Sequence, residues 1–185
     1  MRTFVAAWPD EATRRRLAAL ELGHEKNLRL VGPTRWHITL RFLGEVGEEQ
    51  LVPLGDALEA RAALLMGPVE CRLGPATAWF TGVRVLQLPA HGLDALAAAV
   101  RDATAPVRAG GEPPFNGHLT LARVKGHLGP QGQAELDGIP FAASFAVAHV
   151  DLVASAPSPQ GHVYTTVRRA TLGDGVSPEG RPGRP

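Results

Sequence analysis

The stretch "RWHITLRF", residues 35–42, shares a pattern of histidine, apolar residue, threonine and leucine with "NGHLTLAR", residues 116–123. The two histidines, His37 and His118, lie nearly half of the 185-residue chain apart. Seven histidines and 11 threonines give about 0.4 His-x-Thr triplets by chance, so two triplets alone are a weak signal. Both, however, are followed by leucine and bounded by turn residues. The repetition therefore indicates a shared role, and suggests a duplicated lobe.

The two motifs have the alternation of β-strands. Successive side chains of a strand point to opposite faces, so His37 shares a face with Thr39, and His118 shares a face with Thr120. The apolar residues between them point the other way and are predicted to lie in the core. One such histidine would more often be an ordinary surface residue. The pair favours two strands that present an imidazole and a hydroxyl to a cleft.

The rest of the chain mixes strand and helix patterns. We expect helices over 9–22, 48–65 and 93–105, each with acidic or proline start signals or a glycine or proline stop. Strands are expected over 2–7, 32–44, 68–79, 83–89, 141–155 and 161–172, and one follows a loop within 110–126. This order predicts an α+β fold in a single domain over residues 1–172. The Gly/Pro-rich tail, residues 173–185, is predicted to be disordered.

Composition excludes several classes of protein. A hydrophobic content of 44% with 20% charged residues is typical of a soluble globular domain. The formal net charge is only +1, so attraction to a polyanion must come from a local patch. The single cysteine, Cys71, excludes an intrachain disulfide and a cysteine-cluster metal site, and is expected in the core. No targeting or membrane segment is visible, so we expect a cytoplasmic protein without membrane association.

Two imidazoles and two hydroxyls suit in-line displacement at a phosphodiester. One base must deprotonate the attacking oxygen and one acid must protonate the leaving oxygen, on opposite sides of phosphorus. Imidazole serves either role near neutral pH. The hydroxyls of Thr39 and Thr120 would donate to the non-bridging phosphate oxygens, whose negative charge grows in the transition state. From the residues alone, which histidine is the acid and which the base stays open.

The chain resembles the two-histidine (2H) phosphoesterases, and more narrowly the RNA 2',3'-cyclic phosphodiesterases, also called 2'-5' RNA ligases or LigT-like proteins. The resemblance is carried by "RTFVAAWPDEA", residues 2–12, "WHITLRFLGEV", residues 36–46, "HLTLARVK", residues 118–125, and "SPQGHVY", residues 158–164. It implies two pseudo-symmetric lobes, each an antiparallel sheet backed by helices, with the motif strands facing a central cleft.

The resemblance also implies the reaction and the roles of residues. RNA with a terminal 2',3'-cyclic phosphate would be hydrolysed to a 2'-phosphate without metal or other cofactor, and small cyclic nucleotides are alternative substrates. His37 would be the proton donor and His118 the proton acceptor, with Thr39 and Thr120 binding phosphate. Two alternatives stay open: 2'-5' RNA ligation as the main role, and a non-catalytic RNA or phosphate-binding module. No obligate protein partner is indicated.

Four further residues are candidates for binding substrate. Arg123 would clamp phosphate if the strand bulges, because its parity otherwise places it opposite His118. Arg41 has the parity of His37 and is expected to line the cleft wall. Phe42 is a candidate for stacking on a base, although its parity favours the core. Tyr164 either reaches the cleft or caps the last strand.

No metal site is expected from the histidines. The five histidines outside the motifs, at positions 24, 91, 127, 149 and 162, lack the threonine partner, and we expect most of them at the surface or in turns. A metal bound by the motif histidines would need a third ligand that no local spacing supplies.

Overall fold

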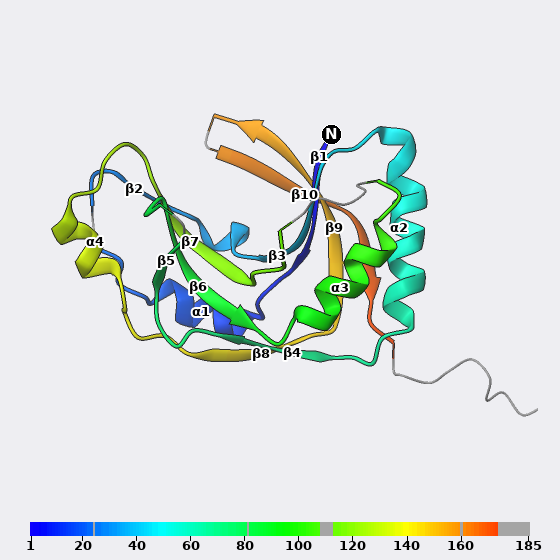
Figure 1. The fold of residues 1–185 in the computed structure, drawn as a ribbon, viewed down its shortest axis with the longest axis horizontal. Coiled ribbons are helices and arrows are strands. Elements are labelled where there is room, and N and C mark those ends of the chain that lie inside the picture. Colours follow the sequence, from blue (N-terminus) through cyan, green and yellow to red (C-terminus); the bar gives the residue numbers. More distant parts are fainter. Residues whose placement is uncertain (24, 81, 108–112, 160, 174–185) are drawn as a thin grey trace, which may run out of the picture.

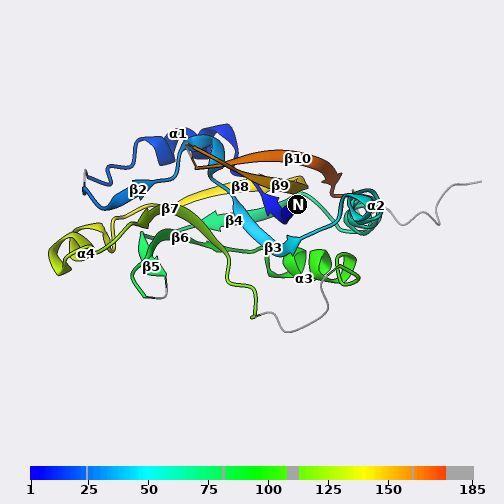
Figure 2. The same cartoon turned by 90° about the horizontal axis from the view of Figure 1, so that it is seen from above.

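The computed structural model describes residues 1–23, 25–80, 82–107, 113–159 and 161–173. These residues form a curled antiparallel sheet with four α-helices around it (Figure 1 and Figure 2), which confirms the α+β class. The strands are β1 (Arg2–Ala7), β2 (Leu28–Leu30), β3 (Ile38–Glu45), β4 (Val69–Leu73), β5 (Ala78–Phe80), β6 (Val85–His91), β7 (His118–Val124), β8 (Ala143–Val147), β9 (His149–Ser158) and β10 (Gly161–Thr171). The helices are α1 (Glu11–Ala18), α2 (Glu48–Ala63), α3 (Asp94–Ala103) and α4 (Pro130–Leu136), with one 3-10 turn, η1 (Pro33–Arg35).

The two motif strands meet in the middle of the sheet. The strand order is β10-β9-β1-β3-β7-β6-β4-β8, with β2 added beside β7 and β5 beside β6. The only register pair of β3 and β7 is Ile38 opposite Leu119. One half of the sheet combines the N-terminal strands β1 and β3 with the C-terminal strands β9 and β10, so neither half is continuous in sequence. The halves correspond to the two expected lobes, and their origin by duplication stays a prediction.

The main core gathers apolar side chains from both halves of the sheet and from α1, α2 and α3. Ile38 and Leu119 are fully buried in it, as strand parity predicts. In Figure 1, α2 and α3 lie at one end of the sheet and α4 at the other. Cys71 is buried in the main core, as expected, and burial raises the pKa of its thiol to about 12. No helix in the described ranges is both long and apolar enough to cross a bilayer.

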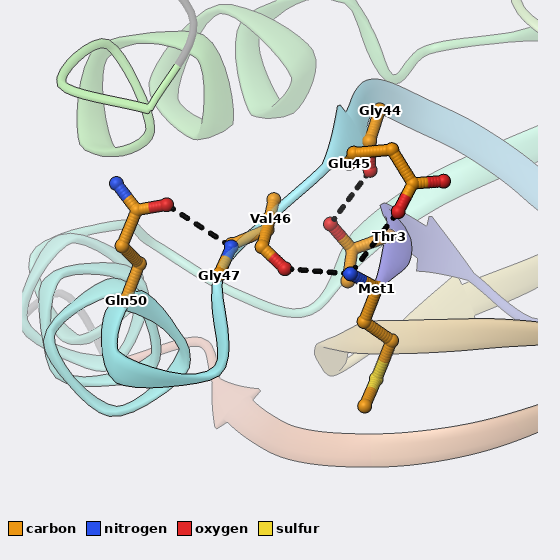
Figure 3. A network of polar contacts seen from close by, with 7 residues as sticks. All are labelled: Met1, Thr3, Gly44, Glu45, Val46, Gly47 and Gln50. Atoms are coloured by element: carbon orange, nitrogen blue, oxygen red, sulfur yellow. Dashed lines mark hydrogen bonds and ion pairs between the residues drawn. The ribbon is translucent and has the colours of Figure 1, made fainter.

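Polar contacts fasten the start of the chain to the end of β3 (Figure 3). The Met1 amino group donates to the Val46 carbonyl at 2.8 Å and lies 3.1 Å from the Glu45 carboxylate. The Gln50 side chain accepts from the Gly47 N–H at 3.1 Å, which satisfies one of the unpaired donors at the start of α2. The loop between β3 and α2 is thereby held against β1.

Several expected boundaries are wrong. The long strand expected over 141–155 is two strands: β8 pairs with β4, whereas β9 pairs with β1 and β10. Because the apolar alternation continues through Ala148, the sequence carries no sign that the chain changes partners there. The short elements β2 and α4 were not expected. Gly173 is placed, its N–H donating to the Ala62 carbonyl at 3.1 Å, and the rest of the expected disordered tail lies outside the described residues.

A buried carboxylate joins β9 to β10. Asp151 is only 1% exposed and accepts two hydrogen bonds from the Arg169 guanidinium, at 2.9 and 3.0 Å. We expect Asp151→Asn to lower the free energy of unfolding by about 2 kcal/mol, because the fork-shaped pair is lost while the buried site remains polar. Urea unfolding measures this. Glu11→Gln, which removes an exposed ion pair with Arg15, is the control and should change stability by less than about 0.5 kcal/mol.

Candidate active site

The four motif side chains line one cavity. This cavity has a volume of about 580 Å³ and lies where the two halves of the sheet meet. His37 and Thr39 reach it from the start of β3, and His118 and Thr120 reach it from β7. The motifs, far apart in sequence, are thus brought to one site. No acidic side chain is among the described residues that line it.

A β-bulge follows each motif at its leucine. In β3, Val5 pairs with Arg41 and Ala6 pairs with Thr39, so Leu40 has no partner on β1. In β7, Leu121 is the extra residue, because the register on β6 skips from Ala122 to Thr120. A bulge inserts one residue and reverses the facing of the residues that follow it, as far as the next irregularity. Simple parity therefore fails from the fourth residue after each histidine.

Phe42 and Arg123 occupy equivalent places after the two bulges. Each lies five residues after its histidine, and both line the cavity. Phe42 is 41% exposed, so its expected place in the core is wrong. Its ring stacks on that of Phe4 at 6.2 Å between centroids, beneath the Arg2 guanidinium. The bulge brings Arg123 to the face of His118, which is the condition under which the sequence predicts it to clamp phosphate.

The expectation that Arg41 lines the cleft is wrong. Its side chain is 5% exposed and donates to the Arg101 carbonyl at 2.8 Å and to the Thr104 hydroxyl at 2.6 Å. These partners lie in α3 and at its C-terminal end, away from the cavity. The cause is the bulge at Leu40, which turns Arg41 to the side of the helices.

Both motif histidines are held in the same way. The Nδ1 of His37 lies 2.6 Å from the Arg35 carbonyl, and the Nδ1 of His118 lies 2.9 Å from the Asn116 carbonyl. A carbonyl only accepts, so Nδ1 carries the proton in each ring and donates it to the carbonyl two residues earlier. When either ring is neutral, its Nε2 has a free lone pair. This tautomer leaves Nε2 to exchange protons with a ligand.

Aromatic rings surround His37. Phe4, Trp8 and Tyr164 lie 4.9, 5.4 and 5.3 Å away between ring centroids, with Tyr164 edge-on at 88°. Tyr164 therefore reaches the cavity, one of the two places expected for it. On the other side, the ring of Phe80 stacks on His118 at 4.8 Å.

The surroundings of His37 favour its neutral form. Burial lowers its pKa to about 4, with smaller contributions from the charges of His118 and Arg123 and an opposing one from the Arg35 carbonyl. The ring is therefore neutral at pH 7. A bound phosphate would favour the charged form, because an opposite charge raises the pKa of an imidazole.

Other cavity residues were not singled out from the sequence. They are Arg2, Phe4, Arg29, Leu30, Val31, Arg35, Ser155, Gly161 and His162. His162, expected at the surface or in a turn, is exposed but lies at the cavity with its Nδ1 3.0 Å from the Ser155 hydroxyl. Parity within β1 and β10 would have placed Arg2 with Phe4 and His162 with Tyr164. Arg29 and Arg35 carry no such signal, because β2 and η1 are too short.

The donor set suits an anion better than a cation. Four guanidinium groups and three imidazoles line the cavity together with two threonine hydroxyls; the arginines are Arg2, Arg29, Arg35 and Arg123. Across the described parts of the chain, no three His, Cys, Asp or Glu side chains come close enough to hold a metal ion. The expectation of metal-free chemistry stays a prediction.

The position of Arg41 predicts a change in stability without loss of activity. We expect Arg41→Met to lower the free energy of unfolding by about 1–3 kcal/mol, since buried acceptors at α3 lose their charged donor. Activity on a cyclic phosphate should stay within about twofold of wild type at temperatures where the variant is folded. A large loss of kcat with unchanged stability would contradict this assignment.

The lowered pKa of His37 predicts a pH-dependent stability. An unfolded chain binds a proton on this ring below pH 6.5, whereas the folded chain binds it only below about 4. The free energy of unfolding should therefore fall as pH drops from 6.5 to 4, by at most about 3 kcal/mol. Denaturant unfolding of wild type and His37→Gln at several pH values measures this, and an equal slope in both proteins would refute it.

Comparison with known proteins places the chain among characterised relatives. Residues 8–68 match the family described as LigT like Phosphoesterase. A curated protein from Thermus thermophilus, named RNA 2',3'-cyclic phosphodiesterase, is 31% identical over 97% of this chain and 100% of its own length.

Solved structures share the fold. The crystal structure of TT0787 from Thermus thermophilus has a TM-score of 0.81 and 31% identity, covering 93% of this chain and 98% of its own. The structure of E. coli LigT complexed with 3'-AMP has a TM-score of 0.71 and 26% identity, covering 92% of this chain and 97% of its own. The resemblance stated from the motifs is thus confirmed.

Proposed function

Because the chain belongs to the LigT-like phosphoesterase family, we propose that it hydrolyses terminal 2',3'-cyclic phosphates of RNA to 2'-phosphates, with His37 as proton donor and His118 as proton acceptor. One observation carries the proposal: both imidazoles are fixed by the same kind of backbone hydrogen bond beside one cavity, whose described lining residues include no acid. The names of the relatives, and the 3'-AMP held by E. coli LigT, support a substrate with a nucleotide end.

The reaction needs two proton transfers and no other reagent than water. His118 Nε2 takes a proton from the attacking water, whose oxygen forms a bond to phosphorus. The bond from phosphorus to the 3'-oxygen breaks, and His37 Nε2 gives its proton to that oxygen. The products are a 3'-hydroxyl and a 2'-phosphate. The proton gained by His118 and the proton lost by His37 then exchange with solvent.

Other cavity groups stabilise charge on the phosphate. The hydroxyls of Thr39 and Thr120 lie on the faces of the two histidines and would donate to the two non-bridging oxygens. The Arg123 guanidinium would add a charged donor. The ring of Phe42 or Tyr164 offers a surface on which the terminal base can stack.

Substrate binding is the step that charges His37. The ring is neutral at pH 7, whereas a general acid must hold a proton. The phosphodiester anion would supply the opposite charge and exclude water at the same time. The acid is thus assembled only with substrate in place, which limits proton transfer to unproductive acceptors.

The two-histidine mechanism predicts the effect of removing either ring. His37→Ala and His118→Ala should each lower kcat/KM about 10²–10⁴-fold with EDTA present, because each loses one proton transfer. The substrate is an RNA oligonucleotide ending in a 2',3'-cyclic phosphate, and the product is analysed by chromatography. His91→Ala, which removes an exposed histidine outside the cavity, should behave as wild type.

Each outcome has a different meaning. Activity lost in EDTA but restored by a metal would refute the metal-free mechanism. Binding of the RNA that survives both substitutions, with no hydrolysis by wild type, would favour a phosphate-binding module. Joining of the cyclic end to a 5'-hydroxyl RNA, faster than hydrolysis, would favour ligation as the main role.

The dependence of the hydrolysis rate on pH should be bell-shaped, and its acidic limb should lie at unusually low pH. In kcat/KM, which reports the free enzyme, one limb is expected near the pKa of about 4 of His37. In kcat, this limb should move to higher pH, because bound phosphate raises the pKa of His37. Initial rates between about pH 3.5 and 9 test this, and a rate that changes in one direction only would argue against the pair.

A further inference from the structure

We propose that Arg29 binds the phosphodiester one nucleotide upstream of the cyclic phosphate, which makes an RNA chain, and not a free cyclic nucleotide, the preferred substrate. This inference rests on the proposed function and extends it to a residue and a subsite. It begins from β2, a strand of three residues that pairs with β7 beyond the bulge at Leu121.

The bulge itself helps to hold β2 in place. The Leu121 carbonyl accepts from the Val31 N–H at 2.8 Å, and the Asn27 carbonyl accepts from the Lys125 N–H at 2.8 Å. Between these two bonds, Arg29 lies directly opposite Arg123 in the antiparallel register. The position of Arg29 is therefore set by backbone pairing on both sides.

Arg29 and Arg123 form a like-charged pair. Residues directly opposite in an antiparallel pair have Cβ atoms about 4.5–5.5 Å apart, and like charges there are destabilising. Both side chains are exposed and line the cavity. Neither has a hydrogen-bond or ion-pair partner among the residues that the structure describes. Two adjacent guanidiniums without a carboxylate suit a phosphate, whose oxygens accept from both forks.

The pair lies to one side of the reacting centre. Along β7, Arg123 is three residues beyond Thr120, which corresponds to about 10 Å of strand. Arg123 lines the same cavity as His37, and its charge contributes to the lowered pKa of that ring, so its guanidinium is close enough to act on the cyclic phosphate. Arg29, on the outer strand, is placed to meet the next phosphate along an RNA chain.

Aromatic rings gather on one side of the cavity, and Arg29 and Arg123 lie on the other. The rings of Phe4, Phe42 and Tyr164 lie on the side of β1, β3 and β10, whereas Arg29 and Arg123 lie on the side of β2 and β7. A terminal nucleoside on the aromatic side, with its cyclic phosphate between the histidines, would leave its 5'-phosphate toward the basic side. A free nucleoside 2',3'-cyclic phosphate has no phosphate there.

The test compares two substrates that differ by one phosphodiester. These are adenosine 2',3'-cyclic phosphate and the dinucleotide ApA with a 2',3'-cyclic end. We expect Arg29→Gln to lower kcat/KM for the dinucleotide about tenfold, mainly through KM, and to leave the mononucleotide within about twofold. Arg84→Gln is the matched control. Arg84 is exposed and adjoins Val85, the β6 partner of Arg123, but Arg84 does not line the cavity. Equal losses on both substrates, or no loss on either, would overturn the proposal.

Binding gives a readout that does not depend on catalysis. For a short RNA with a 3'-phosphate, the slope of log K against log salt concentration should become shallower by about 0.7 in Arg29→Gln, as expected for one lost phosphate contact to a single strand. It should be unchanged in Arg84→Gln, and the Tm of Arg29→Gln should be equal to or above that of wild type. If wild type hydrolyses neither substrate, the proposed function fails while this slope still decides the Arg29 site. An unchanged slope in Arg29→Gln would overturn the proposal that Arg29 binds a phosphate.

Discussion

The pairing of Ile38 with Leu119 is the contact on which the site depends. Strands β3 and β7 share only this register pair, yet it unites two halves of the sheet that are assembled from distant parts of the chain. Both side chains are fully buried, so both strands turn the face that carries these residues toward the core. Because each histidine precedes the buried residue by one position, burying both apolar residues necessarily turns both imidazoles to the cavity.

The bulges add the second set of cavity residues. A regular strand would present the histidine, the threonine and then Arg41 or Ala122 to the cavity. With Leu40 or Leu121 inserted, the residue two places further on faces the cavity instead. The same irregularity thus supplies an aromatic ring on one side and a guanidinium on the other. In β7, the inserted residue Leu121 also provides the carbonyl that accepts from Val31, directly after β2.

Burial and the charges in the cavity together favour the neutral form of His37. Burial is the main reason why the pKa of His37 is lowered, and the charges of His118 and Arg123 add to it without a described carboxylate in the cavity to offset them. In the proposed mechanism, a phosphodiester would offset the positive charge of the guanidiniums that bind it, and its own charge would favour the imidazolium. Under this proposal, binding of the substrate and protonation of His37 would be coupled. The same local excess of positive charge favours an anionic ligand despite a net charge of only +1.

The sequence by itself determined the α+β class, the buried positions in both motifs and the four side chains that face the cavity, because parity and helix signals are local properties of a segment. It could not determine where parity fails: Phe42 and Arg41 exchanged their expected faces at a bulge that depends on the partner strand β1. Nor could it show that β9 and β10 complete the N-terminal half of the sheet, or that Arg29 joins Arg123. These features are decided by pairing between distant strands, which only the folded chain brings together.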